Sequence, residues 1–172
     1  MSITSIKYKE QYNLMHDAGY FPGQQVKRHT QDIKSLVDAY GVESLLDYGC
    51  GKAKCYYVGL AHLEWGGLMP KLYDPYFDVY SERPHGTYDG IICTDVLEHI
   101  PYEDIDDVLH DIFSYANKFI FLVISTKQAK KSLPNGENAH LIVEHEDWWM
   151  QKIHDVSEKY SDDIDVMVKF EG

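Results

Sequence analysis

The sequence predicts an α/β protein with a doubly wound, mostly parallel sheet and helices on both of its faces. Two observations indicate this fold class. Short apolar segments alternate along the chain with segments whose apolar residues recur every three or four positions. Three of the short segments end at or just before an aspartate, as expected where parallel strands deliver polar residues to one edge of a sheet.

The first helix of this pattern is expected at residues 24–40, where the apolar residues keep the spacing of an amphipathic helix. Gly41 follows directly, and a glycine often ends a helix at that position. Residues 105–113 carry the clearest helical stripe of the chain, which indicates packing against the core. Further helices are expected at residues 53–63 and 146–156.

Strands are expected at residues 42–46, 71–73, 88–94, 119–125 and 164–170. The fourth of them is continuously apolar, as a central parallel strand that is buried on both faces requires. Asp47, Asp74 and Asp95 lie at or just past the ends of the first three strands. Because parallel strands end at the same edge of a sheet, these three carboxylates are expected to belong to one ligand site.

Composition and charge narrow the class of protein. The chain has 172 residues, 44% hydrophobic and 26% charged, so residues 1–172 are expected to form one globular domain. Its net charge of −12 argues against a nucleic-acid partner, which would need a basic face. The densest basic group is Lys127, Lys130 and Lys131, and this pattern is typical of a solvated surface.

The cysteines and the apolar segments bear on the cellular compartment. Cys50, Cys55 and Cys93 form no Cys-x-x-Cys pair, so we expect reduced thiols, no disulfide framework and no metal site. The first ten residues lack an apolar signal core, and the longest apolar run is too short to span a bilayer. We therefore expect a cytoplasmic protein without a membrane partner.

A glycine loop follows the first strand and is the strongest motif of the sequence. Asp47 precedes Gly49 and Gly51, and glycines allow a sharp turn and the close approach of a ligand. The dinucleotide fingerprint G-x-G-x-x-G fails here because Lys54 occupies its third glycine position. An acid two residues before the first glycine suits a ligand that carries an ammonium group rather than a pyrophosphate.

These residues resemble the class I S-adenosylmethionine-dependent methyltransferases, which have a Rossmann-like fold. The first motif of that family is acid-x-Gly-x-Gly-x-Gly, and Ala53 stands here for the third glycine. The second motif is an acid at the end of the second strand, which holds the ribose hydroxyls; Asp74 corresponds to it. Residues 88–101 resemble the fourth-strand region of many small-molecule methyltransferases, which ends in Leu-Glu-His.

The resemblance implies a cofactor, S-adenosyl-L-methionine, with S-adenosyl-L-homocysteine as product, and a small-molecule methyl acceptor. It also implies that Glu98 and His99 begin the next helix and that an aromatic residue among Tyr12, Tyr20 and Phe21 closes over the cofactor. The residues that it places at the cofactor are Asp47, Tyr48, Gly49, Cys50, Gly51, Asp74, Pro75, Tyr76, Asp95, Val96 and Leu97.

Two histidines are candidates for the catalytic base that some methyl acceptors need. His99 belongs to the Leu-Glu-His segment, where a structural role is the alternative. His140 lies in a loop with glycine and proline after the predicted strand 119–125, and loops at that edge often carry function. We expect its imidazole to face the cofactor, with Trp148 close by to exclude water.

The chain departs from the family in length. Residues 76–87 leave little room for the usual third strand and its helix, so the acceptor lid is expected to be short or completed by a partner or a second copy. Two other functions therefore stay open beside methyl transfer. They are cleavage of S-adenosylmethionine on the same fold and a non-catalytic, cofactor-binding interaction subunit.

Overall fold

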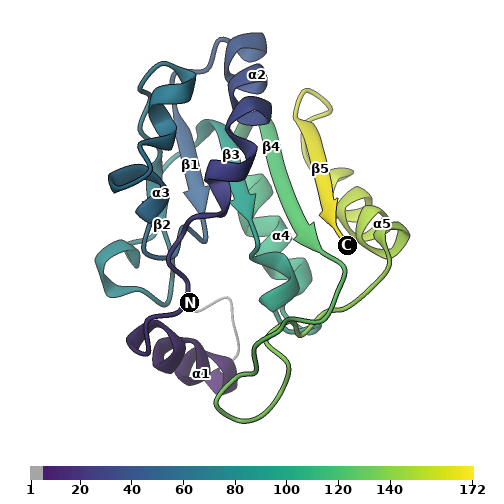
Figure 1. Ribbon diagram of the computed structural model, residues 1–172. Helices are drawn as coiled ribbons and strands as arrows, with labels where there is room; N and C mark the ends of the chain where they lie inside the picture. The colour runs from purple at the N-terminus through teal and green to yellow at the C-terminus, as the bar shows by residue number, and fades with distance from the viewer. Residues whose placement is uncertain (1–5) are drawn as a thin grey trace.

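The computed structural model describes residues 6–172 and contains a five-stranded sheet in the order β2-β1-β3-β4-β5, with every neighbouring pair parallel. In Figure 1 all five arrows point the same way, toward the end of the molecule where α1 lies. The predicted Rossmann-like α/β class is confirmed. The strands are β1 (Leu45–Tyr48), β2 (Lys71–Tyr73), β3 (Tyr88–Thr94), β4 (Ala116–Ser125) and β5 (Asp165–Glu171).

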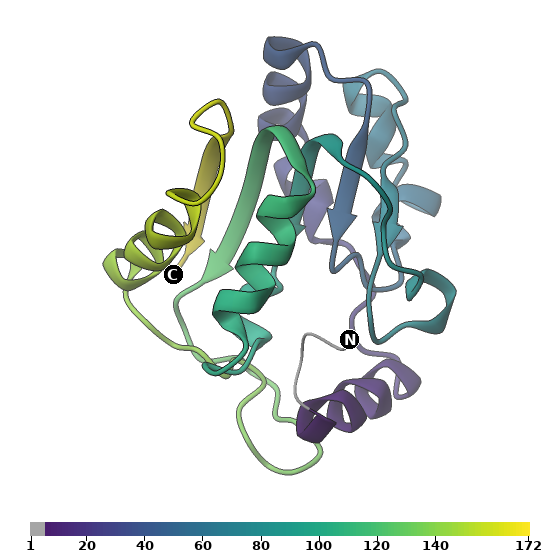
Figure 2. The same cartoon turned by 180° about the vertical axis from the view of Figure 1, so that it is seen from behind.

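Helices cover both faces of the sheet. The α-helices are α1 (Ile6–Asp17), α2 (Thr30–Tyr40), α3 (Lys54–Tyr57), α4 (Ile105–Ser114) and α5 (Glu146–Ser157). Short 3₁₀ helices are η1 (Gln25–His29), η2 (Ala61–Trp65), η3 (Asp78–Tyr80) and η4 (Leu97–His99). Buried residues of α4 and α5 pack on one face of the sheet, and those of α2, α3 and η2 pack on the other. Figure 1 is seen from the side of α2, and Figure 2 from the side of α4.

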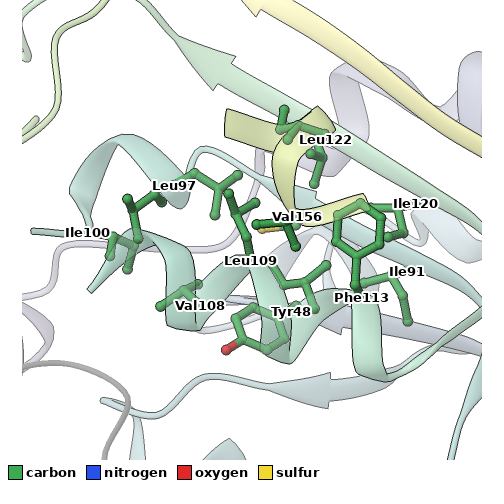
Figure 3. Packing of buried hydrophobic residues seen from close by; sticks show 14 of the residues in the cluster. Tyr48, Ile91, Leu97, Ile100, Val108, Leu109, Phe113, Ile120, Leu122 and Val156 are labelled. Atoms are coloured by element: carbon green, nitrogen blue, oxygen red, sulfur yellow. The ribbon is translucent and has the colours of Figure 1, made fainter. Parts of the chain in front are cut away.

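The two cores follow from the alternation of side chains along each strand. Leu46 and Ile91 point to the α4 side, whereas their neighbours Leu45 and Ile92 point to the α2 side. Figure 3 shows the α4 side, where Phe113 packs with residues of the sheet and of α5. Full burial of a side chain of this size stabilises the fold by roughly 1.5–3 kcal/mol. The sheet is therefore packed on both faces, which fixes the positions of the residues at the ends of its strands.

One predicted helix is wrong in extent. The expected helix at 53–63 is divided into α3 and η2, because Leu60 adopts a left-handed φ of 51° that no α-helix continues through. Tyr57, Leu60 and Leu63, whose spacing suggested one amphipathic helix, are between 50% and 62% exposed. The expected helix at 24–40 is also divided, since its first turn is the 3₁₀ helix η1.

The connection between β2 and β3 is short, as the sequence predicts for residues 76–87. Only η3 lies between β2 and β3, so β2 forms an edge of the sheet and no strand flanks it on its outer side among the described residues. The N-terminal helix α1 was not predicted from the sequence. None of the helices in residues 6–172 is long and apolar enough to cross a membrane.

Candidate functional site

A cavity of about 1160 Å³ opens at the carboxyl ends of β1, β2, β3 and β4. Asp47, Asp74 and Asp95 all line it, so the three acids that end predicted strands do share one edge of the sheet. Ligands of α/β proteins bind at this edge, outside the ends of the strands. This volume is somewhat above the usual range of about 300–1,000 Å³ for ligand pockets, which leaves room for a cofactor and a second small molecule.

The glycine loop is held against the end of β2. The amides of Gly49 and Cys50 donate hydrogen bonds of 2.7 and 3.0 Å to the carbonyl of Tyr73, and the amide of Gly51 donates one of 2.9 Å to Oδ2 of Asp74. Ala53, which stands for the third glycine of the motif, adopts a left-handed φ of 52° just before α3. The loop therefore has a defined backbone shape that faces the cavity.

Asp74 is buried at the end of this loop and already has protein partners. Besides the amide of Gly51, the amide of Tyr76 donates a 2.9 Å hydrogen bond to Oδ1, and Nε2 of His16 lies 3.6 Å from the same oxygen. Each carboxylate oxygen has two lone pairs, so Asp74 can accept further hydrogen bonds from a ligand. Its expected contact with ribose hydroxyls stays a prediction.

Asp47 is buried more deeply, with 2% of its surface exposed. The hydroxyl of Tyr56 donates a 2.8 Å hydrogen bond to its Oδ2. Burial raises the pKa of Asp47 to about 7; the hydrogen bond from Tyr56 opposes this shift, and the negative charge of Asp74 adds to it. A ligand that places an ammonium group beside Asp47 would favour the ionised carboxylate.

Segment 21–23 packs on the glycine loop, and sequence reasoning missed it. The carbonyls of Phe21, Pro22 and Gly23 accept hydrogen bonds from the amides of residues 52, 54 and 55. A Cβ atom on Gly51 would lie 2.6 Å from the carbonyl oxygen of Phe21. The sequence suggests that this space belongs to a ligand, but the structure fills it with backbone. The Pro-Gly pair is the signal that could have indicated a tight turn here.

Of the other residues predicted to contact the cofactor, all but Leu97 line the cavity. Gly49, Cys50, Pro75, Tyr76 and Val96 line the cavity, as do Gly51 and the three acids. Tyr48 also contributes to the lining, although its hydroxyl points to the other side and donates a 2.8 Å hydrogen bond to Asp111. Leu97 does not line the cavity; it is fully buried in the core on the α4 side, as Figure 3 shows.

The Leu-Glu-His segment forms η4 and not the start of an α-helix, which begins only at Ile105. The expected placement of Glu98 at a helix start is therefore wrong. Glu98 is completely buried, and its Oε1 accepts a 3.1 Å hydrogen bond from the amide of Ser125 at the end of β4. Burial raises the pKa of Glu98 well above its usual range, and the charge of Asp95 adds to this shift.

His99 and His140 meet in the lining of the cavity, edge to face, with ring centroids 4.8 Å apart. Nδ1 of His99 lies 2.7 Å from the carbonyl oxygen of Ala139, and Nδ1 of His140 lies 2.5 Å from that of Lys127. Burial, the larger cause, and the neighbouring His140 together lower the pKa of His99 to about 4. His140 thus lies at the same edge of the sheet as Asp47, Asp74 and Asp95.

Helix α1 and the chain between β4 and α5 cover this edge together, as Figures 1 and 2 show. Tyr8, Tyr12 and Met15 of α1 pack with Leu133 and Ala139 of that chain. Of the three candidate aromatic residues, Tyr12 and Phe21 line the cavity and Tyr20 does not.

Trp148 does not reach the cavity, contrary to expectation. It packs instead against Tyr102, with ring centroids 5.8 Å apart, and against Trp149. Trp148 therefore cannot exclude water from His140.

Comparison with known protein families agrees with this geometry. A model of a methyltransferase domain matches residues 26–166, which is most of the chain, so the protein belongs to this methyltransferase family. A comparison with curated proteins gave no match. The matched region includes the glycine loop, all three acids and both histidines of the cavity.

Proposed function

We propose that this protein is an enzyme that transfers the methyl group of S-adenosylmethionine to a small-molecule acceptor. One observation carries the proposal: a single cavity is lined by the glycine loop and Asp74 in one part and by the imidazoles of His99 and His140 in another. The first part suits a nucleoside with an ammonium group. The second suits an acceptor that must lose a proton.

Methyl transfer from a sulfonium is an in-line displacement on an already activated donor, so alignment of donor and acceptor supplies much of the rate. The glycine loop and Asp74 would hold the cofactor. Tyr12 and Phe21, which contribute to the cover of the cavity, would exclude water from the methyl group. In both histidines Nε2 is the ring nitrogen left to act on the acceptor, because Nδ1 faces a backbone carbonyl.

The test is a binding titration followed by product analysis. We expect calorimetry to show binding of S-adenosylmethionine and S-adenosylhomocysteine and no binding of NAD. Incubation with S-adenosylmethionine and pools of small hydroxyl and amine compounds should then release S-adenosylhomocysteine. Release of methylthioadenosine would instead indicate the cleaving enzyme, and binding without any turnover would indicate a cofactor-binding subunit. Binding of NAD alone would contradict all three.

A further inference from the structure

Three side chains converge beside the cavity, two of them from η4 and one from the chain between β4 and α5. These are Glu98, His99 and His140, and one potential ligand atom of each lies within 4.8 Å of those of the other two. A metal ion with bonds of about 2 Å holds its ligand atoms about 3–4 Å apart, so small rotations of these side chains would bring them into coordination distance. The sequence pattern does not reveal the group, because His99 and His140 are 41 positions apart along the chain.

The hydrogen bonds of the two imidazoles select one tautomer. A carbonyl oxygen can only accept, so Nδ1 of His99 must carry its proton toward Ala139 and Nδ1 of His140 must carry its proton toward Lys127. The lone pair of each neutral ring is then on Nε2. A ring N–H donated to a backbone carbonyl is the usual arrangement around a histidine that binds a metal, since it orients the ring and raises the basicity of the other nitrogen.

Glu98 supplies an independent indication. Its side chain is completely buried, and no donor among the described residues forms a hydrogen bond with Oε2, whereas Oε1 is bonded to the amide of Ser125. A buried carboxyl oxygen is costly as an anion, so Glu98 either keeps a proton, which it can share with the neighbouring acid Asp95, or gives the proton up to face a cation. The nearby Lys131 does not supply this cation, because its ammonium lies over the ring of Tyr20, 4.6 Å from the ring centroid.

We propose that Glu98, His99 and His140 bind a divalent transition metal ion, of which Zn²⁺ is the reference case. Two imidazoles and one carboxylate are a ligand set that suits Zn²⁺, Mn²⁺, Co²⁺ or Fe²⁺, whereas Mg²⁺ and Ca²⁺ prefer oxygen ligands alone. Three protein ligands leave a coordination position open, as in catalytic rather than structural zinc sites. That position faces the cavity, because both histidines line it.

The site also defines the acceptor, in a step that rests on the proposed function. A metal ion lowers the pKa of a hydroxyl bound to it, so the preferred acceptor is a molecule with an alcohol, enol or phenol oxygen. The oxygen loses its proton to solvent and uses its electron pair to form the new bond to the methyl carbon. The bond between that carbon and sulfur breaks, and its electron pair stays on sulfur as a neutral thioether. The step needs no oxidant or reductant.

The decisive experiment measures metal binding to the full chain without any substrate. Protein stripped with a chelator and dialysed is titrated with Zn²⁺ by calorimetry and with Co²⁺ by visible absorption. We expect one equivalent to bind, and Glu98→Gln and His140→Ala each to weaken binding by about a hundredfold or more. The Co²⁺ absorption bands of the wild type should be lost in His140→Ala.

Exposed histidines provide the matched controls. His145 and His154 each lie beside a surface carboxylate, 3.3 Å from Asp147 and 3.5 Å from Glu158, and could hold zinc adventitiously. We expect His145→Ala and His154→Ala to bind Zn²⁺ like the wild type. The proposal is overturned if these variants lose the tight binding, if Glu98→Gln and His140→Ala keep it, or if the wild type binds no equivalent.

Two further measurements keep the result interpretable. Circular dichroism and thermal melting show whether each variant is folded, and the partly exposed His140 serves as the test if the buried Glu98→Gln does not fold. A separate titration of metal-free protein with S-adenosylmethionine distinguishes the two proposals. Metal binding without cofactor binding contradicts only the proposed function, whereas cofactor binding without metal binding contradicts only the metal site.

Discussion

The carboxylate of Asp74, at the end of β2, accepts a 2.9 Å hydrogen bond from the amide of Gly51 in the loop that follows β1. The second acidic motif of the sequence thus holds the first glycine motif in place. A role in shaping the loop and a role in binding ribose are compatible, because a carboxylate oxygen accepts more than one hydrogen bond.

Replacement of Asp74 by alanine should therefore weaken cofactor binding, because it removes both the contact with ribose and the hydrogen bond that holds the glycine loop. Hydrogen bonds to a charged acceptor contribute about 1.5–3 kcal/mol, so Asp74→Ala should raise the Kd of S-adenosylmethionine roughly ten- to a hundredfold in calorimetry. Asp78→Ala is the matched control, since Asp78 is exposed in η3 and does not line the cavity. An unchanged Kd in folded Asp74→Ala would mean that another group holds the ribose.

The pKa of Asp47 predicts how stability depends on pH. Its folded-state pKa of about 7 lies above the ordinary value of 3.8, so the native state keeps a proton that the unfolded chain has lost between these values. The contribution of Asp47 to stability is complete below pH 3.8 and is lost as pH rises to 7. Within this window it makes the free energy of unfolding fall by up to about 1.4 kcal/mol per pH unit.

Urea denaturation at several pH values between 4 and 8 tests this assignment. Asp47→Asn cannot titrate, so its free energy of unfolding should fall less steeply with pH than that of the wild type. Asp78→Asn, at an exposed position, should keep the wild-type slope. Equal slopes for Asp47→Asn and the wild type would show that Asp47 is ionised throughout the window.

Gly51 should be needed for the fold as well as for the site. An alanine there would place Cβ 2.6 Å from the carbonyl oxygen of Phe21, at a φ of 55°. Gly41 has the same φ but nothing within 4 Å of a Cβ, so Gly41→Ala isolates the backbone strain, which is about 1–2 kcal/mol. We expect Gly51→Ala to lower the free energy of unfolding by at least about 1 kcal/mol more than Gly41→Ala, since backbone must shift.

Denaturation and cofactor titration of Gly51→Ala and Gly41→Ala show whether Gly51 is needed because backbone packs against it or because a ligand occupies the space beside it. If Gly51→Ala were as stable as Gly41→Ala but failed to bind S-adenosylmethionine, the space beside Gly51 would belong to the ligand after all. Loss of stability together with loss of binding is the result that the packing of segment 21–23 predicts.

The sequence predicts the sheet edge well because strand ends and glycine loops leave local signals. Asp47, Asp74 and Asp95 could be assigned to one edge from the order of strands alone. Helix α1 escaped prediction because its core-facing residues include Tyr8 and Tyr12, whose hydroxyls weaken the apolar pattern. The burial of Glu98 could not be foreseen, because it depends on how η4 packs on the end of β4, a contact between segments far apart in the sequence.

His140 gives the most informative activity measurement. His140→Ala should lower the rate of S-adenosylhomocysteine release about a hundredfold with the acceptor found in the screen, as expected for loss of a group that helps to deprotonate the acceptor. The Kd of S-adenosylmethionine should barely change, because no contact with the cofactor is assigned to His140. His145→Ala, at an exposed position in the same segment, should keep the full rate. Full activity of His140→Ala would leave His99 as the candidate.

The same variant, compared with metal-free wild type, separates two ways in which Nε2 of His140 could act. A nitrogen that binds a metal ion has no lone pair left to accept a proton, so the two roles exclude each other at one moment. If His140 is a ligand, the stripped wild type should be as slow as His140→Ala, and Zn²⁺ should restore the wild type alone. If His140 accepts the proton directly, the stripped wild type should keep its rate while His140→Ala stays slow, because the imidazole then needs no metal.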